Sequence, residues 1–192
     1  MQAEHRKIPE RLVVNHLRKA TGELHSRLEK RFDAVTELAD PSRRSSVMRR
    51  YAALHGPAHG ALARELEGVD GLDFDSRIGA WSAVKWPTFD VRAAPPFPDA
   101  ADRCEALGVL YVLEGSTLGG RFILRELEAQ GIEGPEFFFL DPYGRSGGRM
   151  WRTLLAVIER EGSRGPACLE GLCRGAMRGF LHAECVLCGD WF

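Results

Sequence analysis

The stretch LGVLYVLEGSTLGGRFILREL, residues 107–127, is the part of the chain that says most about its fold. Its apolar side chains recur at the spacing of one helical face, namely Leu107, Leu110, Tyr111, Leu118 and Phe122. The stretch is therefore predicted to form a helix. Gly115, Gly119 and Gly120 lie inside this helix, although each interior glycine costs a helix about 1 kcal/mol relative to alanine.

Two explanations of these glycines are open at the level of the sequence. Gly115 and Gly119 are one turn apart on the same face, and their missing side chains leave room there for another object. Close packing of a second helix through small residues is one explanation, and the stretch taken alone favours it. The other is a planar cofactor lying across a kinked helix, which requires an iron ligand elsewhere in the chain.

The composition is that of one soluble globular domain. The 192 residues are 44% hydrophobic and 28% charged, which suits a single domain over residues 1–192, with 1–14 expected to be only partly ordered. The net charge of −1 gives no general attraction to nucleic acid or anionic membranes. No apolar run is long enough to predict a membrane span, and no apolar segment typical of a secretory signal opens the chain. A cytoplasmic protein is expected.

The cysteine pattern favours reduced thiols over a disulfide framework, because an odd number of cysteines clusters late in the chain. Cys185 and Cys188 form a CxxC motif, but no second pair at zinc-site spacing accompanies them. They are interpreted as free thiols carried on a helix. The five cysteines are Cys104, Cys168, Cys173, Cys185 and Cys188.

Periodicity and helix-end signals predict an all-α bundle of about six to eight helices. The segments 87–98 and 131–148 are rich in proline, glycine and aromatic residues and are predicted to be loops. The predicted helices run from Asn15 to Phe32, from Asp40-Pro41 to about Leu66 with a kink at Gly56-Pro57, from Asp75 to about Lys85, from Asp99 to Gln130, from Gly148 to Gly162, and from Gly165 or Pro166 onward.

Among the histidines, His25 is the best candidate for an iron ligand. It shares a helical stripe with Arg18 and Thr21 beside an apolar stripe, and imidazole suits haem iron. His55 and His59 have the i, i+4 spacing of a metal pair, but Gly56-Pro57 disturbs that geometry and no HExxH glutamate is present.

Two other motif classes are weak. Residues 144–148, GRSGG, match the letters of a nucleophile elbow, but no strand precedes them, and a loop is the expected structure. The Glu-x-x-His motifs of di-iron bundles do not occur in the sequence.

Three stretches resemble haem oxygenases of the bacterial type associated with bacteriophytochromes. LRKATGELHSRLE (Leu17–Glu29) resembles their proximal helix, and LGVLYVLEGSTLGG (Leu107–Gly120) resembles their distal helix. PYGRSGGRMWRTLL (Pro142–Leu155) is similar to the following loop and helix. The matches cover a minor part of the chain, but their order and spacing fit the remainder. The resemblance implies a haem-oxygenase-like multi-helix bundle with a kinked distal helix.

The resemblance also implies roles for individual residues. His25 falls on the proximal ligand of the haem iron, and Gly115 and Gly119 fall on the distal glycines whose backbone lies against the haem. The remaining positions fall where the family places contacts to the haem propionates, and they are Arg18, Arg152 and Tyr111.

Ser116 departs from the mammalian-type pattern, which has an aspartate directly after the first distal glycine. The bacterial members that the chain resembles also carry serine there. Ser116 is therefore expected to pass protons through ordered water, with Thr117 as the alternative.

The implied activity is cleavage of haem, which is both substrate and cofactor, to biliverdin, CO and Fe2+. Electrons would come from an external reductase, ferredoxin or flavodoxin, and the bilin, made by α-cleavage, would pass to a bacteriophytochrome. Two other classes compete with this enzyme, namely a haem-binding or haem-transfer protein that does not degrade haem, and an interaction module that has lost haem.

Overall fold

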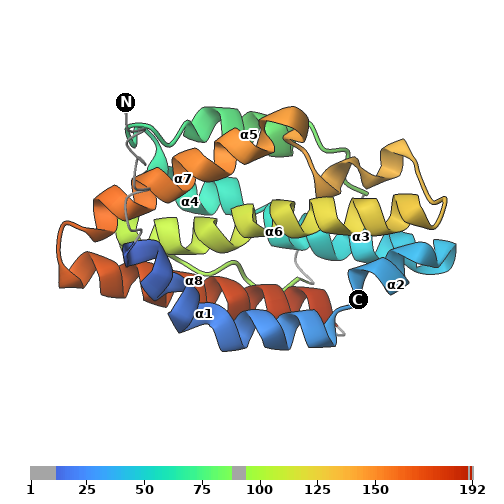
Figure 1. Ribbon diagram of the computed structural model, residues 1–192, viewed down its shortest axis with the longest axis horizontal. Helices are drawn as coiled ribbons and strands as arrows, with labels where there is room; N and C mark the ends of the chain where they lie inside the picture. Colours follow the sequence, from blue (N-terminus) through green and yellow to red (C-terminus); the bar gives the residue numbers. More distant parts are fainter. Residues whose placement is uncertain (1–11, 88–93, 190, 192) are drawn as a thin grey trace, which may run out of the picture.

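The structure is a computed structural model that describes residues 12–87, 94–189 and 191. This part of the chain contains eight α-helices and two 3-10 turns, without a β-strand, so the all-α prediction is confirmed (Figure 1). The elements are α1 Leu12–Arg31, α2 Ala34–Ala39, α3 Pro41–His55, α4 Ala58–Leu66, α5 Phe74–Ser82, α6 Arg103–Ala129, η2 Pro135–Leu140, η3 Gly144–Ser146, α7 Gly147–Gly162 and α8 Pro166–Cys188.

Helix α6 lies in the centre and runs parallel to α8, its main packing partner. The backbones approach closely because both helices carry glycine where they meet. A Cβ on Gly108 would collide with the carbonyl oxygen of Leu172, and one on Gly175 with the carbonyl oxygen of Glu105. Glycine therefore fixes the separation and register of this pair.

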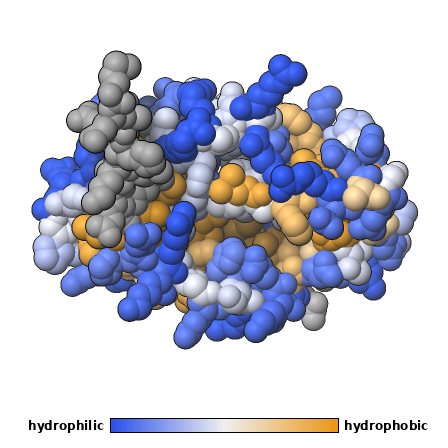
Figure 2. Space-filling view, in the orientation of Figure 1, coloured by the Kyte–Doolittle hydropathy of each residue, from blue (hydrophilic) through white to orange (hydrophobic). Residues whose placement is uncertain are grey.

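Helix α1 also runs parallel to α8, so α1 and α6 flank α8 in the same direction (Figure 1). Arg27 and Arg31 both donate to the buried carboxylate of Glu184 in α8, at 2.9 and 2.6 Å from its Oε1. Helices α1 and α6 each pack against α8 far more than against each other. Figure 2 shows an apolar hollow with a polar rim in the strip between them.

The first helix begins earlier than the local sequence indicates. It already includes Leu12, and the Glu159 carboxylate of α7 accepts hydrogen bonds from the backbone N–H groups of Val13 and Val14, at 3.0 and 3.2 Å. Asn15, the predicted cap, is therefore inside the helix. Residues 1–11, most of the segment expected to be partly ordered, lie outside the described part.

Other boundaries shift by a few residues. Gly56-Pro57 separates α3 from α4, as the predicted kink requires, and α5 ends at Ser82 rather than near Lys85. Helix α2 was not predicted.

Helix α6 begins at Arg103, four residues later than predicted, because Asp102 rather than Asp99 accepts the N-terminal hydrogen bond, from Glu105 N at 2.9 Å. Of the predicted loop 87–98, residues 88–93 are outside the described part.

The segment 131–148 is an ordered connection, as expected. Phe137 and Phe139 are buried within η2, so this aromatic run is not a strand. Ser146 ends the short turn η3, and no strand precedes it among the described residues. The geometry of a nucleophile elbow is therefore missing here.

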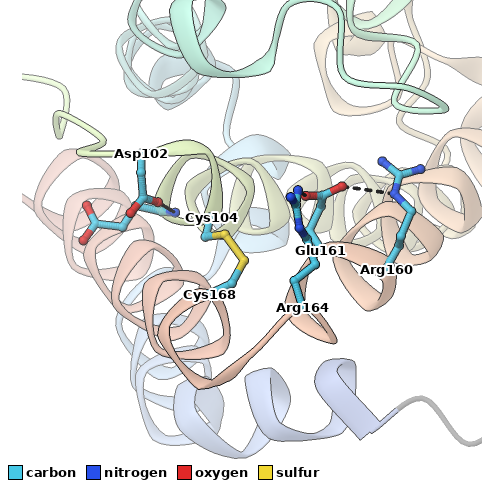
Figure 3. Close-up of a disulfide and its surroundings, with 7 residues drawn as sticks. Asp102, Cys104, Arg160, Glu161, Arg164 and Cys168 are labelled. Atoms are coloured by element: carbon cyan, nitrogen blue, oxygen red, sulfur yellow. Dashed lines mark hydrogen bonds and ion pairs between the residues drawn. A yellow bond between two sulfur atoms is a disulfide. The ribbon is translucent and has the colours of Figure 1, made fainter.

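A disulfide joins the starts of α6 and α8, between Cys104 and Cys168, with a Cα–Cα distance of 5.4 Å (Figure 3). The expectation of reduced cysteines is wrong for this pair, because the close approach of α6 and α8 brings the two positions together. Cys173, Cys185 and Cys188 are free, so the interpretation of the last two as helix-borne thiols is confirmed.

Helix α6 is long and apolar enough to cross a membrane by length and composition alone. Over half of the relevant window is buried inside the protein, and core helices of soluble proteins pass the same test. This feature argues neither for nor against a membrane.

Candidate functional site

His25 of α1 and the Gly115–Gly119 pair of α6 lie at about the same level along the bundle, beside the hollow between the two helices. Burial raises the pKa of the Tyr111 hydroxyl of α6, and Arg18 of α1 lies close enough to oppose that rise, which relates the positions of the two helices along the bundle. His25 lies seven residues beyond Arg18, about 10 Å along the axis. Gly119 lies eight residues beyond Tyr111, about 12 Å along α6 in the same direction.

Gly115 and Gly119 present open backbone to this hollow. A Cβ on Gly119 would meet no described atom within 4 Å, and one on Gly115 would meet only Trp151, at 3.9 Å. Gly120 is different, because its Cβ would collide with the carbonyl oxygen of Leu140. Close packing thus explains Gly120 but not the other two glycines.

Apolar side chains continue the open glycine face of α6. Phe122 lies two turns beyond Gly115 on the same face and is 54% exposed. Leu118, between them, is half-buried. Large exposed apolar side chains beside bare backbone are typical of a site for a flat apolar ligand.

Filling the glycine face is predicted to weaken ligand binding without loss of stability. Gly119→Leu has room for its side chain and gains helix propensity. We expect unchanged or higher resistance to urea and at least about tenfold weaker hemin binding, or about 1.4 kcal/mol. Gly60→Leu on the exposed face of α4 is the matched control, because its Cβ also meets no described atom within 4 Å. Equal hemin affinities in the two variants would contradict this assignment.

His25 has one ring nitrogen beside a neighbouring carboxylate. Its side chain is 56% exposed, and Nδ1 lies 3.5 Å from the Glu29 carboxylate one turn later. The ring meets Phe180 of α8 edge-on, at 5.5 Å between centroids. A carboxylate beside Nδ1 leaves Nε2 as the nitrogen available to a metal. The contact with Glu29 was not predicted, although its i, i+4 spacing from His25 is visible in the sequence.

The expected propionate contacts are only partly brought together. Arg18 and Tyr111 meet, and burial raises the pKa of the Tyr111 phenol while Arg18 opposes that rise. Tyr111 packs against Trp151, at 5.3 Å between ring centroids. Arg152 follows Trp151 on α7 and is exposed, and no described contact joins it to Arg18 or Tyr111.

Ser116 and Thr117 differ in where their hydroxyl groups lie. Ser116 is half-buried, and its Oγ lies 2.6 Å from the Leu113 carbonyl oxygen and 3.1 Å from Nε2 of His55. Thr117 is buried and donates to the Glu114 carbonyl oxygen at 2.7 Å. Ser116 is therefore the better placed of the two to contact a ligand in the hollow.

His55 is occupied by contacts other than His59. Its Nε2 contacts Ser116, and its ring stacks on Trp81 at 3.7 Å between centroids. No group of three or more potential metal-ligating side chains occurs among the described residues. A contact between residues 61 positions apart has no signal in a single sequence.

A buried polar cluster supports α6 on the side away from α8. Arg77 of α5 pairs with Glu114 at 2.7 Å, and the Tyr143 hydroxyl donates to the same carboxylate at 2.6 Å. Burial raises the pKa of the Glu114 carboxyl, against the opposing effect of Arg77. This cluster fixes the segment of α6 that carries Gly115 and Ser116.

The residues of the hollow fit a flat apolar group that has an anionic edge and one open metal position. His25 offers an imidazole nitrogen, the bare backbone at Gly119 accepts a planar face, and Arg18 offers a cation. Neither a scan against models of protein families nor a search of curated proteins finds a match to this chain.

Proposed function

We propose that this protein is a haem oxygenase, which uses O2 and reducing equivalents to convert haem into biliverdin, CO and Fe2+. The observation that carries the proposal is the open backbone at Gly115 and Gly119, at the level of an exposed imidazole on the facing helix. Plain helix packing requires neither the open glycine face nor the exposed histidine. Together they match the needs of a flat iron-bearing ligand.

In this proposal the chain binds and orients the haem, and the haem supplies the iron that activates oxygen and the ring that is cleaved. His25 would ligate through Nε2 while Glu29 holds Nδ1–H. Gly115 and Gly119 would accept the opposite face of the ring at backbone distance. Arg18, with Tyr111 beside it, would pair with a propionate, and Arg152 with the second one. Ser116 would hold water beside the ring.

The partners follow from the proposed reaction. Electrons would come from a reductase, ferredoxin or flavodoxin, and the bilin product would go to a bacteriophytochrome. A cytoplasmic location is part of the proposal. Disulfides are rare in that compartment, so the state of Cys104 and Cys168 in intact cells tests this part.

One observation favours a second function, haem binding or transfer without degradation. Ser116 directs its hydroxyl at the Leu113 carbonyl oxygen, and the position directly after Gly115 carries no carboxylate. A distal side without a strong acid or base suits a carrier as well as an enzyme.

Turnover separates the two functions. The protein with one equivalent of hemin is incubated in air with ascorbate or with a ferredoxin and its reductase, and products are followed by absorbance and mass spectrometry. We expect biliverdin and CO from wild type and from His16→Ala, which removes an exposed histidine of α1. No biliverdin is expected from His25→Ala. A haem complex that persists unchanged with both reductants would point to the carrier.

A further inference from the structure

His55 is held rigidly at the end of α3. Its residue is only 2% exposed, and its ring lies nearly parallel to Trp81 and Tyr51, with interplanar angles of 12° and 16°. Burial, helped by the nearby His59, lowers the pKa of His55 to about 3. The imidazole is therefore neutral at physiological pH, and one ring nitrogen donates while the other accepts.

The geometry around Ser116 decides which nitrogen donates. The Ser116 Oγ lies 2.6 Å from the carbonyl oxygen of Leu113, which can only accept, so the hydroxyl hydrogen points there. Nothing remains on Ser116 to donate to His55, whose Nε2 lies 3.1 Å away. The hydrogen in that second contact must therefore belong to Nε2 of His55.

We propose that His55 is a positioning residue for Ser116: it donates Nε2–H to the serine, whose own hydrogen is held by Leu113, so that Ser116 meets the hollow as a hydrogen-bond acceptor only. A hydroxyl has one hydrogen and two lone pairs, and these two contacts leave one lone pair free. This inference rests on the proposed function as far as it concerns turnover. The hydrogen bond itself does not depend on that function.

An acceptor at this position orients a donor rather than giving up a proton. A water molecule that donates one hydrogen to Ser116 has its second hydrogen free to point along the ligand face. A proton used in the reaction would then come from that water, which solvent would reprotonate, with Ser116 and His55 unchanged in protonation. His55 would serve here as a fixed dipole, because its neutral form neither accepts nor loses a proton near pH 7.

The tautomer can be measured without haem. Long-range 15N–1H spectra of the histidine side chains would be recorded for wild type and for Ser116→Ala between about pH 5 and 8. We expect His55 to carry its hydrogen on Nε2 throughout this range, and the Nε2 signals to move when the serine hydroxyl is removed. A hydrogen on Nδ1, or titration of His55 within the range, would overturn the proposal.

The role in turnover is tested by His55→Gln and His55→Leu on the haem complex. The glutamine amide can donate to Ser116 and the leucine cannot. We expect similar hemin affinity in both variants, turnover about tenfold lower with leucine, as for one lost hydrogen bond in the transition state, and recovery of most of this loss with glutamine. Undiminished turnover with leucine would overturn the positioning role.

Two further outcomes remain decisive. If the leucine variant does not fold, Ser116→Ala replaces it, because Ser116 is half-buried and its loss should leave the fold intact; undiminished turnover there would equally overturn the proposal. Failure of wild type to bind hemin would overturn the proposed function and the positioning role together. The spectra would still decide the direction of the His55–Ser116 hydrogen bond.

Discussion

Replacing Arg77 by methionine is expected to lower the free energy of unfolding by about 3–5 kcal/mol. The Arg77 side chain is fully buried, where it pairs with Glu114 and donates to the carbonyl oxygens of Leu72 and Met150, at 2.8 and 2.7 Å. Methionine fills similar space but leaves the Glu114 carboxylate without its cation and both carbonyls without a donor. Urea unfolding followed by circular dichroism measures the loss.

Arg149→Met is the matched control for Arg77→Met. Arg149 faces Asp73 at 3.4 Å, but its side chain is 57% exposed, and such surface pairs contribute about 0–1 kcal/mol. The double variant Arg77→Met/Glu114→Gln should recover part of the loss, because no buried charge remains. Equal stabilities of the two single arginine variants would show that the buried pair does not hold α5 to α6.

Loss of the Cys104–Cys168 disulfide is the second large effect. The bond closes a loop with a sequence separation of 64 residues, and the chain-entropy relation gives a stabilisation of about 4 kcal/mol for such a loop. The double variant Cys104→Ser/Cys168→Ser should therefore melt about 10 °C lower than wild type. Scanning calorimetry at matched protein concentration measures the difference.

Reduction provides the control for the disulfide prediction. Dithiothreitol should destabilise wild type and Cys173→Ser, which removes a half-buried free thiol of α8, but leave the double variant unchanged. Alkylation of thiols in intact cells before lysis, followed by mass spectrometry, shows whether the bond exists in the proposed compartment. An identical melting temperature with and without the bond would show that the α6–α8 contact holds by glycine packing alone.

The sequence predicted the helices well where a regular hydrophobic repeat extends over many residues, as in α6 and α8. It predicted them poorly where contacts with distant residues decide the boundaries. Asn15 is a good local cap, yet α1 already includes Leu12, and Glu159, far along the chain, accepts hydrogen bonds from Val13 N and Val14 N. The disulfide was missed for the same reason, since Cys104 and Cys168 meet only when α6 packs alongside α8.

The candidate site shows the same division. Sequence reasoning selected His25, and selected Gly115 and Gly119 by their one-turn spacing, but it gave no separate reason for Gly120. Only the position of η2 shows that Gly120 is packed against a backbone while Gly119 is open. From the sequence, His55 was considered only as a metal ligand paired with His59. Its contact with Ser116 joins two distant parts of the chain, so a single sequence gives no sign of it.

A hemin titration tests the central claim most directly. Hemin is added to wild type, His25→Ala and His16→Ala, and the Soret band is followed together with the spectrum of the ferrous CO complex. The proposal predicts a one-to-one complex with histidine-ligated spectra in wild type and His16→Ala, and loss of that ligation in His25→Ala. Identical spectra and affinities for all three proteins, or no complex with wild type, would contradict the assignment of the hollow between α1 and α6 as a haem site.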